Sequence, residues 1–225
     1  MSYQNLLNAF EDASIEANCG LVEKSCDPAA CFKPGDNGRE TFNCIVHCKD
    51  WKWRSTSSGR EGKRINILLR IAETIRRRDQ ALLTSVVQVN YLSVDERRAS
   101  LLQAFHFDYN PCQRDHALFH AQLTDECFEI PSTDIDSLKI DFAMPERATP
   151  RIRCARIPTC DMTFPSVLVC LAADHIGGVL FQGFRSKASE LQKKMPYPLI
   201  TKLKRSLGTD SMDLRSSHWF AHFSR

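Results

Sequence analysis

Long apolar runs are missing from this sequence of 225 residues. A membrane-spanning helix needs about 20 consecutive apolar residues, and the longest candidate, residues 167–173, is far shorter. The N-terminal residues also lack the basic stretch and the apolar segment that together mark a secretory signal. The sequence therefore predicts a cytoplasmic protein with no membrane partner.

Complete catalytic motifs are missing as well. The H-E-x-x-H pattern of many zinc hydrolases does not occur. Asp136, Lys139 and Asp141 do not have the spacing of a common nuclease core. Since a fold class by itself says little about chemistry, the sequence leaves open whether the protein is an enzyme. Function has to be argued from groups of residues.

Cysteine, by contrast, is abundant, with ten residues. In a cytoplasmic chain, reduced thiols or a metal site are more common than disulfides. Two cysteine pairs near the N-terminus flank a loop rich in glycine, asparagine and aspartate, and structural zinc sites share this layout. The alternative is that these cysteines pack as small apolar side chains. The candidate zinc ligands are Cys26, Cys31, Cys44 and Cys48.

Apolar residues at helical spacing predict helices on both sides of a central region. Ser58 and Glu61 have the spacing of a capping box, and the apolar side chains that follow predict an amphipathic helix ending at Arg78. Pro165 suits the first turn of a later helix, which two glycines end. The predicted helices are residues 4–17, 58–78, 165–176, 186–194 and 199–207.

Between these helices the apolar residues alternate with polar ones, which is the pattern of half-buried strands. Short connections favour antiparallel pairing. The predicted strands are residues 87–91, 105–109, 119–123 and 138–142, with a fifth at 152–157.

The sequence therefore predicts an α+β protein. Its antiparallel meander sheet of four to five strands is flanked by an N-terminal amphipathic helix and by C-terminal helices. A serine- and threonine-rich stretch, residues 55–58, is the expected boundary between a small cysteine-rich N-terminal segment, residues 1–57, and a main domain, residues 58–225.

Charge is distributed unevenly along the chain. Residues 49–78 contain ten basic and three acidic side chains, residues 125–146 are strongly acidic, and residues 185–205 are again basic. Basic side chains can follow a phosphate backbone, and Trp51 and Trp53, if exposed, can stack on bases. The alternative is that the arginines form a solvated surface and the tryptophans lie in the core. The candidate nucleic-acid-binding residues are Lys52, Arg54, Lys63, Arg64, Arg70, Arg76, Arg77 and Arg78.

A second candidate site lies in the hairpin formed by the second and third predicted strands. Alternation places the aromatic residues of both strands toward the core and the polar residues on the other face. Two imidazoles and a carboxylate can act as general acid and base or bind a divalent metal. The alternative is that these side chains form an ordinary polar sheet face. The candidate catalytic residues are His106, Asp108, His116 and His120.

Two functions follow from these groups. The first is a protein that binds RNA, single-stranded DNA or an acidic protein partner, as a candidate subunit of a larger assembly. The second is a nuclease-like hydrolase that uses the histidines and aspartate of the hairpin. Structural zinc is the one cofactor that the sequence suggests.

Overall fold

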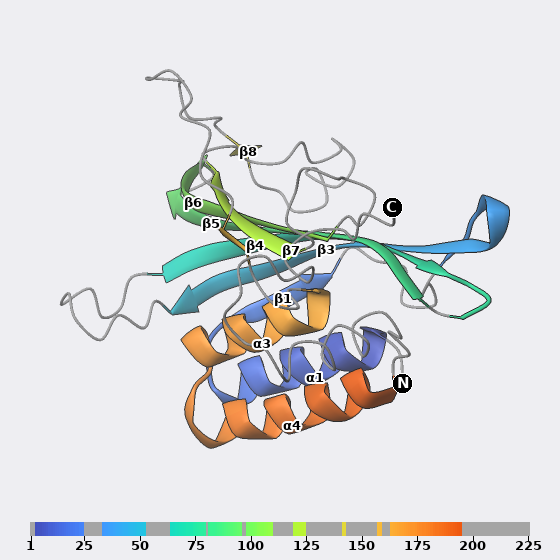
Figure 1. Ribbon diagram of the computed structural model, residues 1–225. Helices are drawn as coiled ribbons and strands as arrows, with labels where there is room; N and C mark the ends of the chain where they lie inside the picture. The colour runs from blue at the N-terminus through green and yellow to red at the C-terminus, as the bar shows by residue number, and fades with distance from the viewer. Residues whose placement is uncertain are drawn as a thin grey trace.

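The computed structural model of the protein describes residues 3–24, 33–52, 64–79, 81–95, 98–109, 119–124, 141–142, 157–158 and 163–194. A twisted sheet forms its centre, and three helices lie together against one side of it (Figure 1). The class is α+β, as predicted from sequence.

The sheet is larger than predicted. Five long strands follow one another as an antiparallel meander, β3-β4-β5-β6-β7, and β1 pairs with the outer edge of β3. Three two-residue strands add to this sheet: β2 pairs with β3, β8 runs parallel to β6, and β9 pairs with β7. The strands are β1 Leu21–Lys24, β2 Lys33–Pro34, β3 Arg39–Lys52, β4 Arg64–Arg76, β5 Ala81–Asp95, β6 Arg98–Tyr109, β7 Phe119–Thr124, β8 Asp141–Phe142 and β9 Ile157–Pro158.

The helices bury their apolar sides against the sheet and one another. Helix α1 spans Tyr3–Glu16, α3 spans Phe164–His175 and α4 spans Gly178–Lys194. The core between the layers is rich in aromatic rings; Phe10 packs on Trp51, with ring centroids 5.4 Å apart. The helices predicted at residues 4–17, 165–176 and 186–194 are therefore confirmed, and α4 begins eight residues earlier than predicted. Among the described residues, no helix has the length and apolar character needed to cross a membrane.

The helix predicted at residues 58–78 is wrong, because its described part forms strand β4. The apolar residues there satisfy a helical period, yet Ile65, Ile67, Leu69 and Ile71 also alternate on one side of the chain. Leu68 is buried on the other side of the sheet, so both faces of β4 are apolar near its middle. Such a continuous apolar run does not distinguish a strand from a helix, and the three isoleucines favour a strand.

A buried carboxylate joins the sheet to two helices. Glu73 of β4 is 1% exposed and accepts a hydrogen bond from the Tyr3 hydroxyl of α1. It also accepts hydrogen bonds from the Ser85 hydroxyl, at 2.8 Å, and from the backbone N–H of Phe164, at 2.9 Å. Phe164 begins α3, where the helix dipole favours a negative charge. Glu73 therefore fixes how α1 and α3 sit on the sheet.

Several predictions lie outside the described residues. These are the helix at residues 199–207, most of the strands predicted at residues 138–142 and 152–157, and the boundary near residue 57. The division into residues 1–57 and 58–225 stays a prediction.

Candidate functional site

The sheet face opposite the helices, here called the outer face, carries the polar residues of the central strands. The strand register places Arg70 of β4, Gln88 of β5 and His106 of β6 in one row across the sheet. Asp108 lies two residues further along β6, opposite Val86. Since adjacent strands are about 4.8 Å apart, the row spans about 10 Å from Arg70 to His106.

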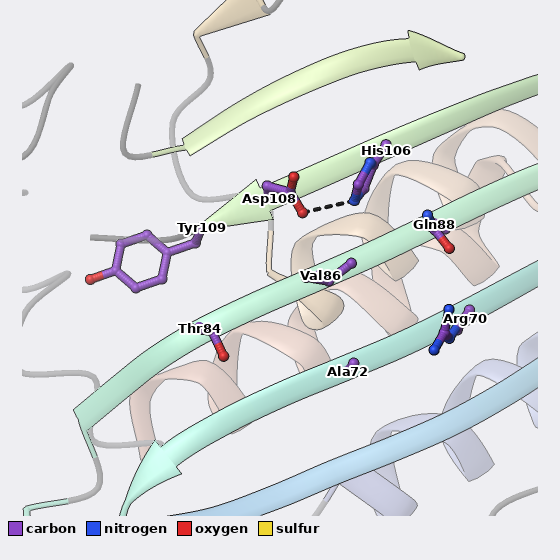
Figure 2. A pocket seen from close by; sticks show the side chains of 8 residues that line it. All are labelled: Arg70, Ala72, Thr84, Val86, Gln88, His106, Asp108 and Tyr109. Carbon is purple, nitrogen blue, oxygen red and sulfur yellow. Dashed lines mark ion pairs between the residues drawn. The ribbon is translucent and has the colours of Figure 1, made fainter. Parts of the chain in front are cut away.

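These side chains surround a cavity of about 430 Å³ on the outer face (Figure 2). Within it, His106 Nε2 lies 2.8 Å from Asp108 Oδ1, and the two side chains are 27% and 24% exposed. Gln88 Oε1 is buried and makes no hydrogen bond within the described part of the chain, so it can accept one from a ligand. The cavity is lined by Arg70, Ala72, Thr84, Val86, Gln88, His106, Asp108 and Tyr109.

The alternation of β6 positions His106 and Asp108 as predicted. Phe105 and Phe107 lie on the helix side of the strand, stacked with ring centroids 6.2 Å apart, and pack against the core. The pleat then directs His106 and Asp108 to the outer face. Tyr109 is buried, and its ring points away from the His106–Asp108 pair in Figure 2.

The other two candidate catalytic residues are less completely described. In the pairing of β6 with β7, His120 lies opposite Asp108 and Gln122 lies opposite His106. The backbone register therefore brings His120 beside Asp108 and one row away from His106, and the catalytic role of the hairpin stays a prediction. His116 lies outside the described residues.

Next to the cavity, the buried polar residues His47 and Asn66 lie on the outer face beside the exposed Glu23. His47 of β3 is 1% exposed. Its Nε2 lies 2.7 Å from Asn66 Oδ1 and its Nδ1 lies 3.3 Å from Glu23 Oε2. Because both ring nitrogens have a partner, the imidazole is held in one orientation. His47 therefore links β1 and β4 across β3 on this face.

Three of the candidate nucleic-acid-binding residues share the outer face of β4. Arg64, Arg70 and Arg76 are six residues apart along a regularly alternating strand, which corresponds to about 20 Å between neighbours. In the backbone register of β3 and β4, Lys52 lies opposite Arg64 at one end of this row, and Arg39 lies opposite Arg76 at the other end. The strand therefore spreads these charges along the outer face.

Arg77 and Arg78 follow β4 in the turn that leads to β5. They lie within ion-pair distance of Glu40, at 3.3 Å, and of Asp79, at 3.9 Å, respectively. Both side chains are largely exposed. Arg54 and Lys63 lie outside the described residues.

Trp51 does not provide a stacking surface for bases, contrary to that hypothesis. Its side chain is completely buried, and its indole N–H donates a hydrogen bond to the Leu21 carbonyl, at 3.2 Å. Its ring also meets His175 edge-on at 5.5 Å. A β-bulge between Cys48 and Trp51 places the ring on the helix side. Trp53 lies outside the described residues.

The two described cysteines of the candidate zinc site lie in the core. Cys44 and Cys48 sit four residues apart on β3 and are 3% and 0% exposed, a separation of about 13 Å along the strand. One tetrahedral zinc ion, with Zn–S bonds of about 2.3 Å, does not reach both. Burial, and secondarily the neighbouring Cys19, raises the pKa of the Cys48 thiol.

The structural zinc site suggested by the sequence stays a prediction. Among the described residues, no group of three or more histidine, cysteine, aspartate or glutamate side chains is arranged to hold a metal ion. Cys26 and Cys31 lie outside the described residues.

Sequence reasoning missed Gln88 and Arg39. The signal for Gln88 was present, because it is the polar residue between Val87 and Val89 in a predicted strand. Its position beside His106 depends on strand register, which a single strand pattern does not give. Arg39 carried no comparable signal, since it lies far from Arg76 in sequence and meets it only through the pairing of β3 with β4.

Comparison with known proteins identifies no relative: no family model, no curated protein and no solved structure matches the chain.

Proposed function

We propose that the protein binds single-stranded RNA or DNA across the outer face of its sheet. The observation that carries the proposal is the row of Arg64, Arg70 and Arg76 along β4, with the cavity beside Arg70. Guanidinium groups bind phosphate oxygens in a two-pronged geometry, and a spaced row suits the phosphates of an extended strand better than one compact anion.

The cavity supplies groups that can contact a base. Gln88 offers a buried carbonyl oxygen, and the His106–Asp108 pair offers a ring and a carboxylate within the same space. Bases of single strands can be splayed out and hydrogen-bonded on their edges, whereas bases in an RNA duplex are largely hidden. A concave site of this kind therefore favours a single strand over a duplex.

The proposal predicts a steep salt dependence of binding. For single strands, the slope of log affinity against log salt is about −0.7 per phosphate contact, so three arginine contacts give a slope of about −2. Fluorescence anisotropy with a labelled mixed-sequence oligonucleotide, over a series of salt concentrations, measures this slope. Absence of binding at the lowest salt contradicts the proposal. If the protein binds polyglutamate as tightly as it binds the oligonucleotide, an acidic protein partner is favoured over nucleic acid.

A second candidate function is hydrolysis of a phosphodiester at the same cavity, favoured by the approach of His106 Nε2 to Asp108 Oδ1 at 2.8 Å. Because Nε2 of His106 faces Asp108, Nδ1 is the nitrogen that can accept a proton from an attacking water molecule. Asp108 would stabilise the imidazolium that forms. Arg70, across the cavity, is the group suited to offset charge on the phosphate.

In this hydrolysis the water oxygen bonds to phosphorus, one of its protons passes to His106, and the bond from phosphorus to the leaving oxygen breaks. The leaving oxygen takes up a proton, and His120, opposite Asp108 in the register, is the candidate donor.

A further inference from the structure

A second cavity lies where the turn before β3 meets the turn after β4. Its volume is about 580 Å³, within the range of about 300–1,000 Å³ that is typical of small-molecule sites. Its lining includes four arginines and one leucine. The lining residues are Asn37, Gly38, Arg39, Arg76, Arg77, Arg78 and Leu83.

The backbone builds this cavity from two turns that are bonded to each other. Asn37 and Gly38 both have left-handed φ angles, of 60° and 69°, which glycine and asparagine adopt most readily. The Gly35 N–H donates to the Arg39 carbonyl at 2.8 Å and closes the first turn. The Arg77 N–H then donates to the Gly38 carbonyl, also at 2.8 Å. These bonds hold the first turn beside the second.

The ion pairs around the cavity orient its arginines. Arg76 meets Asp79 at 3.0 Å, and Asp79 also accepts a hydrogen bond from the Ala81 backbone N–H at 3.3 Å. In the pairs that Arg76, Arg77 and Arg78 make, the nitrogen of closest approach is Nε. The Asp79 carboxylate therefore accepts a hydrogen bond from the inner edge of the Arg76 guanidinium group, whose terminal nitrogens extend further from the chain.

The charge balance of the cavity is positive. Three carboxylates lie in this part of the fold, those of Asp36, Glu40 and Asp79, against four guanidinium groups. Arg39 makes no ion pair with any residue of the described chain. An anion can therefore bind here without displacing an existing partner of Arg39.

A β-bulge adds an apolar wall. The pairing of β4 with β5 shifts between Thr74 and Ile75, so that Leu82 and Thr84 have partners and Leu83 is the extra residue. Bulges of this kind redirect a side chain and are common beside functional sites. Here the half-buried Leu83 side chain lines the cavity, where it can pack against a sugar or a base.

We infer that this cavity binds the nucleotide at one end of the strand through its terminal phosphate monoester. The inference deepens the proposed function and rests on it. A phosphate monoester carries about −1.5 to −2 charges at neutral pH, more than the single charge of a phosphodiester, and a cavity lined by four arginines favours that higher charge. Arg76 is shared with the row on β4, so a strand held at its end here continues toward Arg70, about 20 Å away.

The test compares three oligonucleotides of one sequence that carry a 5′-phosphate, a 3′-phosphate or hydroxyl groups at both ends. The wild-type protein is expected to bind one phosphorylated form at least tenfold more tightly than the hydroxyl form. In Arg39→Ala and in Arg78→Ala the preference is expected to fall below twofold. Arg70→Ala is expected to weaken all three oligonucleotides and to keep the preference. Thermal unfolding checks that each variant is folded.

A parallel titration with a nucleoside monophosphate and with inorganic phosphate separates this inference from the proposed function. If the phosphorylated and hydroxyl oligonucleotides bind with equal affinity, the inference of a terminal-phosphate site is wrong and the proposed function stands. If none of them binds but the nucleoside monophosphate binds wild type and not Arg39→Ala, the phosphate site stands and the proposed function fails. Equal binding of the nucleoside monophosphate to wild type and Arg39→Ala overturns the inference.

Discussion

Replacement of Glu73 by alanine is expected to destabilise the protein by about 3–5 kcal/mol, because several buried donors lose their shared acceptor. The Tyr3 hydroxyl, the Ser85 hydroxyl and the Phe164 N–H all donate to this carboxylate. Without it, buried donors lose their acceptor, at a cost of about 1–3 kcal/mol for each group left unsatisfied. The contacts of α1 and α3 with the sheet should weaken together.

Urea unfolding followed by circular dichroism measures this effect. Glu73→Gln keeps an acceptor oxygen and is expected to cost less than Glu73→Ala. Glu190→Ala removes an exposed carboxylate from α4 and is expected to change the unfolding free energy by less than about 0.5 kcal/mol. A Glu73→Ala protein as stable as the Glu190→Ala control would show that the carboxylate does not hold the layers together.

Replacement of His106 by alanine is expected to lower phosphodiester hydrolysis by about 10²–10⁴-fold, the usual contribution of a general acid or base. The fold should persist, because the side chain is partly exposed and lines a cavity outside the helix-facing core. Asp108→Asn should also lower the rate, since it removes the charge that stabilises the imidazolium. Release of fluorophore from a quenched oligonucleotide measures the rate.

The matched control for this prediction is Gln103→Ala. Gln103 is exposed on the same strand and lies outside the cavity, so its loss should leave the rate unchanged. If the wild-type protein hydrolyses no oligonucleotide, with or without added divalent metal ions, the proposal that it is a hydrolase is rejected. The proposal that it binds single-stranded nucleic acid is not affected by that result. Should His106→Ala unfold the protein, the histidine is structural.

How far the sequence predicts the fold depends on how unambiguous each pattern is. The alternation of Phe105, His106, Phe107 and Asp108 allows only one periodicity, and both the strand and its facing were predicted correctly. The segment that becomes β4 is apolar on both sides near its middle, because Leu68 is buried on the outer face while Ile67 and Leu69 are buried under the helices. The apolar residues of this segment fit a helical period as well as a strand period, and the helix predicted from them was wrong.

The candidate sites depend on tertiary structure that a local sequence pattern does not predict. That His106 and Asp108 share a face follows from one strand. That Arg70 and Gln88 join them follows from the register of three strands, which depends on packing and on bulges. Arg76 was selected for its charge alone; its position beside Arg39 and Leu83 required the β3–β4 pairing and the bulge in β5. A local sequence pattern therefore predicts individual site residues, whereas the strand register determines which of them lie together.

The most direct test of binding on the outer face is a comparison of two charge-matched double variants. Arg64→Ala with Arg70→Ala removes two positive charges from the outer face of β4, and Arg185→Ala with Lys187→Ala removes two from the exposed side of α4. Both lower the net charge equally, so they change long-range attraction to a similar extent. We expect the β4 double variant to lose at least tenfold in oligonucleotide affinity and about 1.4 in the magnitude of the salt slope, and the α4 double variant to lose neither. Equal losses in the two variants, or a loss confined to α4, would contradict binding on the outer face.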